Sequence, residues 1–249
     1  MVHYQSTRGH KETLSFQDVI LSGLAPDKGL YLPDSITLEN LAYLTQEDLS
    51  YEDFVKTIFI SLDQASAKYV DDLAIYPGFE NSPEPTLKEL NDSTVVMELF
   101  YGPTKSFKDY ALQPLGAIAN RRLDELGERG LVIVATSGDT GSAAIQAVKN
   151  SENIDIVVLH PANKVSEYQR KQMTSVIQDN VLNIAVEGSY DDCQRIAKEL
   201  LSENPFGRRI ISLNSINWLR VMGQVSYYVW LTKQFSSPIN VAIPSGNFG

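Results

Sequence analysis

The stretch Leu131–Gly141, LVIVATSGDTG, decides the fold of this 249-residue chain. Its first five residues are a continuous apolar run, which is typical of a strand buried on both faces of a sheet. A glycine-rich turn at Ser137–Gly141 follows, and Ala143, Ala144 and Ala147 then indicate a helix of small residues. A buried strand, a tight turn and a helix form the unit from which parallel α/β sheets are built.

The same alternation of strand and helix continues on both sides of this unit. Upstream, Val95–Phe100 is expected to be a strand, and the helix after it carries Pro114 near its start, where we expect a bend. Downstream, we expect strands at 154–159, 181–186, 209–213 and 239–243, and helices at 166–177, 190–201 and 217–235. The sequence therefore predicts an α/β fold, with a parallel sheet and helices on both of its faces.

Residues 1–93 lack this alternation, and we expect a small α+β amino-terminal domain there. The expected elements are short helices at 13–21, 38–44 and 50–62, a short strand within 23–33, and a stiff, extended connector at 77–93. We divide the chain into this domain with its connector at 1–93, an α/β lobe at 94–237 and the start of a second lobe at 238–249.

Composition and charge exclude several classes of protein. An apolar fraction of 43% and a charged fraction of 21% are those of an ordinary soluble domain, and no run of eighteen apolar residues suits a membrane span. A net charge of −10 disfavours nucleic acid as a partner, so any phosphate site must be built locally. Because no secretory signal is visible and Cys193 is the only cysteine, we expect a cytoplasmic protein.

Two common kinds of catalytic site are not indicated. No metal site is expected, because His3, His10 and His160 are dispersed along the chain. A Ser-His-Asp triad is not expected either, because the motif Gly-x-Ser-x-Gly is absent. The chain stops at Gly249, inside a glycine-rich turn after an expected strand, and we interpret it as a piece of a longer protein.

Lys108, in the stretch Phe100–Tyr110, FYGPTKSFKDY, is the candidate for chemistry. The Gly-Pro pair forces a turn, and Ser106 with Asp109 three residues later is typical of a helix start. Lys108 is then expected in the first turn of a helix, beside two aromatic residues. Loss of hydration and the positive end of the helix both lower the pKa of such a lysine. They favour the free amine, which is the form that can build a Schiff base.

Two glycine-rich turns indicate where this lysine acts. Ligands of open α/β sheets bind beyond the carboxyl ends of the strands, and the turns after Phe100, Ala135 and Ile243 are expected at such ends. The turns at 137–141 and 245–249 lead into helix starts, where converging backbone N–H groups favour an anion. Either turn alone is also compatible with a plain tight turn between strand and helix. Together with the lysine they predict an anion site beside a reactive amine.

Three motifs resemble those of the threonine synthase family. They are GPTxxFKD at 102–109, TSGDTG at 136–141 and PSGNFG at 244–249. The segments YxSTRG at 4–9, GLAPDxGLY at 23–31 and NSIN at 214–217 are similar to the same family, so the resemblance covers the whole chain. It implies a pyridoxal-phosphate enzyme of fold type II, the architecture of the tryptophan synthase β chain.

The resemblance also implies roles for particular residues. Lys108 would hold the cofactor and later move protons between substrate carbons, and Asp139 would lie beside the ring hydroxyl of the cofactor. Residues whose backbone N–H groups would bind the cofactor phosphate are Gly246, Asn247, Phe248 and Gly249. Candidates for gripping the phosphate and carboxylate of the substrate are Ser137, Thr140, Lys164, Ser166, Asn214, Asn217 and Arg220. From the residues alone, Ser166 is equally compatible with a helix cap and Arg220 with a surface position.

The implied reaction converts O-phospho-L-homoserine and water to L-threonine and phosphate, in a monomer or a homodimer. The family is considerably longer than this chain, so we expect the site to be incomplete and the partner of the pyridine nitrogen to be absent. Two alternatives stay open. One is a phospholyase of the same fold, which releases phosphate from hydroxy-amino-acid phosphates and gives a keto acid. The other is a non-catalytic module that binds phosphometabolites.

Overall fold

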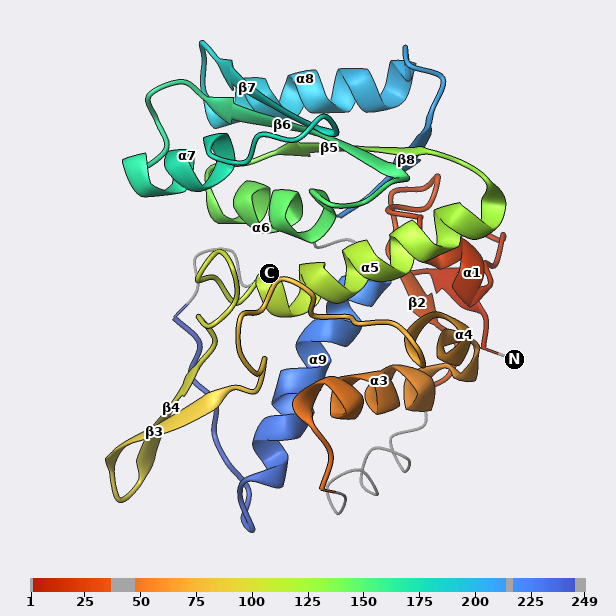
Figure 1. Cartoon of the computed structure of the whole chain (residues 1–249). Coiled ribbons are helices and arrows are strands. Elements are labelled where there is room, and N and C mark those ends of the chain that lie inside the picture. The colour runs from red at the N-terminus through yellow and green to blue at the C-terminus, as the bar shows by residue number, and fades with distance from the viewer. Residues whose placement is uncertain (1, 37–47, 214–216, 245–249) are drawn as a thin grey trace.

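A four-stranded parallel sheet organises the structure, a computed structural model that describes residues 2–36, 48–213 and 217–244 (Figure 1). The strands follow one another across the sheet in the order β7 (Val181–Val186), β6 (Ile154–Pro161), β5 (Gly130–Ala135) and β8 (Arg209–Ile211). β5 pairs with β6 on one side and β8 on the other, so it lies inside the sheet and its apolar run is buried.

Helices cover both faces of this sheet (Figure 1). α8 (Tyr190–Glu203) lies on one face, and α6 (Asp139–Val148) with α5 (Asp109–Leu126) lies on the other. Successive side chains of β5 point to opposite faces, so Leu131 packs in the cluster of Cys193 from α8, whereas Val132 packs in the large core. The predicted α/β fold with helices on both faces is confirmed. None of the helices in the described ranges is long and apolar enough to cross a membrane.

The strand predicted at 95–100 forms, but the prediction that it belongs to the parallel sheet is wrong. β4 (Thr94–Glu98) pairs antiparallel with β3 (Thr86–Asn91), and the two make a separate hairpin. The turn is fixed locally, because the Asn91 side-chain oxygen accepts a hydrogen bond of 3.1 Å from the N–H of Ser93. The segment expected to be a connector therefore contains a strand at 86–91.

The strand expected at 239–243 is not observed. These residues are described without regular secondary structure, and no described strand pairs with them. An apolar run of β-branched residues predicts a strand only if a neighbouring strand supplies hydrogen bonds, and the sequence pattern does not report that neighbour.

The amino-terminal part combines short strands and helices, as predicted. β1 (Tyr4–Ser6) pairs antiparallel with β2 (Tyr31–Pro33). The helical elements are α1 (Phe16–Val19), α3 (Tyr51–Leu62), the 3₁₀ turn η1 (Gln64–Ser66) and α4 (Ala67–Val70). The helices expected at 13–21 and 50–62 are present, the first shorter than predicted, and the helix expected at 38–44 lies outside the described residues. These elements share one continuous apolar core with α5 and α9 (Trp218–Lys233).

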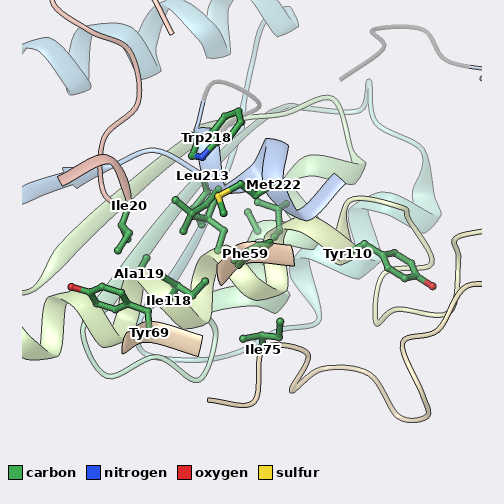
Figure 2. Close-up of a cluster of buried hydrophobic side chains, with 14 of the residues drawn as sticks. Ile20, Phe59, Tyr69, Ile75, Tyr110, Ile118, Ala119, Leu213, Trp218 and Met222 are labelled. Atoms are coloured by element: carbon green, nitrogen blue, oxygen red, sulfur yellow. The ribbon is translucent and has the colours of Figure 1, made fainter. Parts of the chain in front are cut away.

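Figure 2 shows part of this core, in which Tyr110, Ile118 and Ala119 of α5 belong to the same buried cluster as Trp218 and Met222 of α9. The two helix backbones approach closely, because a Cβ on Gly223 would lie 2.8 Å from the Cα of Ala111.

Pro114 lies inside α5, where it cannot donate to the carbonyl of Tyr110 four residues earlier. The hydroxyl of Tyr76 donates to that carbonyl instead, at 3.0 Å. A partner from the amino-terminal part thus fixes the start of α5, where the candidate lysine lies.

Candidate active site

Lys108 lies at the very start of α5, as its N-cap residue, one position before the first turn in which the sequence placed it. Its side chain is 17% exposed, and the amine lies 4.4 Å from the centre of the Phe107 ring. Burial of the amine is the largest cause that lowers the pKa of Lys108, and the nearby Arg220 guanidinium adds repulsion in the same direction. Desolvation therefore lowers the pKa of this lysine in the structure, as predicted.

Asp109 holds the loop that carries the lysine. Its carboxylate is fully buried and accepts hydrogen bonds from the backbone N–H of Thr104 at 2.8 Å and from the Thr104 hydroxyl at 2.9 Å. The sequence pattern paired Asp109 with Ser106, but the Asp109 carboxylate binds Thr104, two residues earlier in the chain. Gly102 is required here, because a Cβ on it would lie 2.4 Å from an oxygen of Asp109.

The buried Asp109 carboxyl makes stability depend on pH. Burial raises the pKa of Asp109 to about 6 from an ordinary value of 3.8, against the opposing effect of the bonds from Thr104. The folded state therefore binds the proton more tightly than the unfolded state. The contribution of Asp109 to stability is fully present below about pH 4 and is lost as pH rises through 6, by up to about 3 kcal/mol. Urea unfolding of the wild type and of Asp109→Asn at each pH is expected to show this loss as a change in the difference between their free energies of unfolding.

The glycine-rich turn brings a carboxylate to the lysine. Thr136, at the end of β5, accepts hydrogen bonds through its hydroxyl oxygen from the N–H groups of Gly138 at 3.0 Å and Gly141 at 3.1 Å. α6 then begins at Asp139, whose Oδ2 lies 3.6 Å from the Nζ of Lys108. The predicted meeting of amine and glycine turn is confirmed for the turn at 137–141, and the turn at 245–249 lies outside the described residues.

The physical reason for this meeting differs from the predicted one. Of the turns after Phe100, Ala135 and Ile243, the turn after Ala135 is the one that follows a described strand of the parallel sheet, at the end of β5. The lysine loop follows the β3–β4 hairpin, and it reaches the site because α5 packs against α6. That packing is close, since a Cβ on Gly116 would lie 2.6 Å from the carbonyl oxygen of Ala147.

α7 (Glu167–Thr174) touches both loops through two residues that were not among the predicted site residues. Gln169 donates from Nε2 to Asp139 Oδ1 at 2.5 Å, and Gln172 donates from Nε2 to the carbonyl oxygen of Thr104 at 2.7 Å. Their spacing of three residues on a helix with a polar start is the only sequence signal, and it does not identify their partners.

Gly138 has a backbone conformation that other residues avoid, with φ +154° and ψ −95°. A Cβ at this position would lie 2.3–2.5 Å from the side-chain amide of Gln169. We expect Gly138→Ala to lower the free energy of unfolding by about 1–3 kcal/mol, because strain and the clash add. Chemical denaturation would measure this loss. Gly127→Ala is the control, since Gly127 also has a positive φ but nothing lies within 4 Å of its Cβ position.

Arg220 is a buried cation with little local compensation. Its residue is 3% exposed, its Nε has no partner among the described residues, and one terminal nitrogen lies 3.5 Å from the carbonyl oxygen of Leu213. Burial lowers the pKa of Arg220 to about 10. The surface reading of this helix residue is therefore wrong, and its charge faces the same region as Lys108.

The remaining candidates lie in different environments. Ser137 is exposed and Thr140 half-buried, and both flank the Gly138–Asp139 turn. Lys164 is exposed in the turn before α7, and Ser166 caps that helix by accepting from the N–H of Gln169 at 3.3 Å.

Asn217 is fully buried and engaged with the protein. Its side-chain nitrogen donates to the carbonyl oxygens of Ile20, Ser22 and Ser212, and its oxygen accepts from the N–H of Leu219 at 2.9 Å. It therefore caps α9 and ties it to the amino-terminal part. Candidates outside the described residues are Asn214, Gly246, Asn247, Phe248 and Gly249.

Two protein-family models match the chain. The model described as threonine synthase N terminus matches residues 3–68. The model described as pyridoxal-phosphate dependent enzyme matches residues 83–249, which is more than half of the chain.

Individual relatives agree with these matches. The chain is 42% identical to threonine synthase of Pseudomonas aeruginosa, over 100% of this chain and 55% of that protein. A solved structure of pyridoxal-phosphate-bound threonine synthase from Brucella melitensis superposes with a TM-score of 0.82 at 36% identity, covering 96% of this chain and 53% of that one. Yeast threonine synthase gives 0.81 at 30% identity, covering 94% and 50%. The chain thus spans about half the length of the relatives it matches, and it belongs to the family of pyridoxal-phosphate dependent enzymes.

Proposed function

We propose that this protein acts as a threonine synthase, a carbon-oxygen lyase that converts O-phospho-L-homoserine and water to L-threonine and phosphate in the cytoplasm. The observation that carries the proposal is the half-buried Lys108 amine, 3.6 Å from the Asp139 carboxylate and close to a buried Arg220. The sequence and structural likeness to threonine synthases supports it.

The described residues fit pyridoxal phosphate. An amine with a lowered pKa suits an aldehyde carbon, and a buried guanidinium with an unpartnered Nε suits an anionic ligand. Lys108 would hold the aldehyde carbon, and Asp139 would lie beside the ring hydroxyl. The backbone N–H groups proposed for the phosphate belong to Gly246, Asn247, Phe248 and Gly249. The bound cofactor supplies an electron sink, so that protons can leave carbons of the substrate.

The protein's own groups would bind the substrate and move its protons. The lowered pKa of Lys108 favours its neutral amine. This nitrogen would take a proton from one substrate carbon and return it to another. Arg220, Ser137 and Thr140 would hold the anionic groups of the substrate, with Lys164 and Asn214 as further candidates.

Two of the candidates would act indirectly. The hydroxyl of Ser166 and the side-chain amide of Asn217 are both engaged in helix caps. In this proposal Ser166 supports Gln169, and Asn217 holds the start of the helix that carries Arg220.

Product analysis tests the proposal directly. The intact protein is incubated with pyridoxal phosphate and O-phospho-L-homoserine, and amino and keto acids are separated. Threonine with an equal amount of phosphate supports the proposal, whereas 2-oxobutyrate supports the phospholyase of the same fold. If neither forms and borohydride traps no cofactor on the Lys108 peptide, the protein is a non-catalytic module that binds phosphometabolites.

A further inference from the structure

Gln169 is the one side chain of α7 that reaches Asp139 among the described contacts. We infer that Gln169 is a positioning residue, which holds the Asp139 carboxylate in place beside the Lys108 amine. The inference deepens the proposed function, since it rests on that function for the purpose of the Lys108–Asp139 pair. The contacts from which it is argued join protein atoms only, so they involve neither cofactor nor substrate.

The two oxygens of the Asp139 carboxylate have separate partners. Oδ1 accepts a hydrogen bond of 2.5 Å from Gln169, and Oδ2 lies 3.6 Å from the Lys108 nitrogen. The Asp139 side chain is 45% exposed, so without a partner it would be free to turn toward water. The bond from Gln169 is therefore what keeps Oδ2 directed at the amine.

The orientation of the Gln169 amide is itself fixed. Its Oε1 accepts from the hydroxyl of Ser166 at 2.9 Å, so its nitrogen must face the carboxylate. Gly138 leaves the space that this amide fills, as the distances of 2.3–2.5 Å to a Cβ there indicate. The Gln169 side chain thus contacts the cap residue of α7, fills the space beside Gly138 and binds the turn next to Lys108.

This geometry explains an acid at position 139. A carboxylate can accept a hydrogen bond from Gln169 with one oxygen and attract the Lys108 ammonium with the other. An asparagine that accepted from Gln169 would present its NH₂ group to Lys108, and when Lys108 is the ammonium, two donors would face each other. The other charged groups around Lys108 are Asp109, which is bound to Thr104, and Arg220, which repels the amine.

Competitive labelling of the Lys108 amine with acetic anhydride, without cofactor, tests the inference. Gln169→Leu is expected to release Asp139 into water, so that more Lys108 is free amine and labelling below the pH midpoint accelerates about two- to five-fold. Gln169→Met has a similar length but no amide to donate, and labelling is expected to accelerate by a similar factor. Gln178→Leu, at an exposed glutamine beyond the end of α7, is the control and leaves the profile unchanged.

A double-mutant cycle separates positioning from a merely structural role. In an Asp139→Asn background, Gln169→Leu is expected to change Lys108 labelling no further, because the carboxylate it holds is gone. Folded Gln169 variants with the wild-type profile would overturn the inference. If Gln169→Leu does not fold, Gln169→Met decides alone. Because labelling needs neither cofactor nor substrate, its failure is distinct from a failure to form threonine.

Discussion

Lys108→Ala is expected to abolish threonine formation, lowering kcat by a factor of about 10³ or more while the protein stays folded. The amine has two parts in the proposed reaction, since it holds the cofactor and moves protons, and no second amine is described beside Asp139. The Lys108 side chain makes no capping hydrogen bond at the start of α5, so the fold is expected to survive its removal. Steady-state rates of phosphate and threonine release measure the effect, and circular dichroism checks the fold.

Lys105→Gln is the matched control for this variant. Lys105 lies in the same loop, three residues earlier, but it is exposed. It is expected to retain wild-type activity, because the loop is held by Thr104 and Asp109 rather than by its side chain. Threonine formation by Lys108→Ala at more than a few percent of the wild-type rate would contradict the assigned role.

Local patterns were sufficient for most of the elements and for the principal pair of the site. The apolar run at 131–135 is buried on both faces because β5 has neighbours on both sides, which is the situation that such a run indicates. The helix starts expected at 50, 190 and 217 lie within one residue of those of α3, α8 and α9, and each of these helices has a cap residue that accepts from an N–H two or three residues later. Lys108 and the turn at 137–141 meet as predicted, although the lysine loop follows the β3–β4 hairpin and not a strand of the parallel sheet.

The features that sequence reasoning missed depend on partners far apart in the chain. Gln169 reaches Asp139 across 30 residues, and Gln172 reaches Thr104 across 68. β4 was assigned to the wrong sheet because its own apolar pattern is the same whether its neighbour is parallel or antiparallel. Burial of Arg220 follows from the packing of α9 on α5, which helical periodicity alone does not determine.

We expect Arg220 to stabilise a bound anion and to lower the free energy of unfolding of the protein. A guanidinium that is 3% exposed and lacks a carboxylate partner in the described structure has lost hydration without an equivalent gain. A protein of net charge −10 also repels anionic substrates at long range, so a local cation is needed to hold them. The two arguments assign opposite signs to the effect of Arg220 on stability and on binding.

Arg220→Met is therefore expected to raise the free energy of unfolding by about 1–3 kcal/mol, since methionine fills the same space without a charge. The same change is expected to lower kcat/KM for O-phospho-L-homoserine by a factor of about 10²–10³, the loss that follows when a buried charge pair is broken. Urea denaturation and initial rates measure the two effects. Arg220→Lys keeps the charge without the planar fork, and its stability and kcat/KM are expected to fall between those of the wild type and Arg220→Met. A variant that loses stability and activity together would show instead that Arg220 is part of the core, held by contacts such as that with the Leu213 carbonyl.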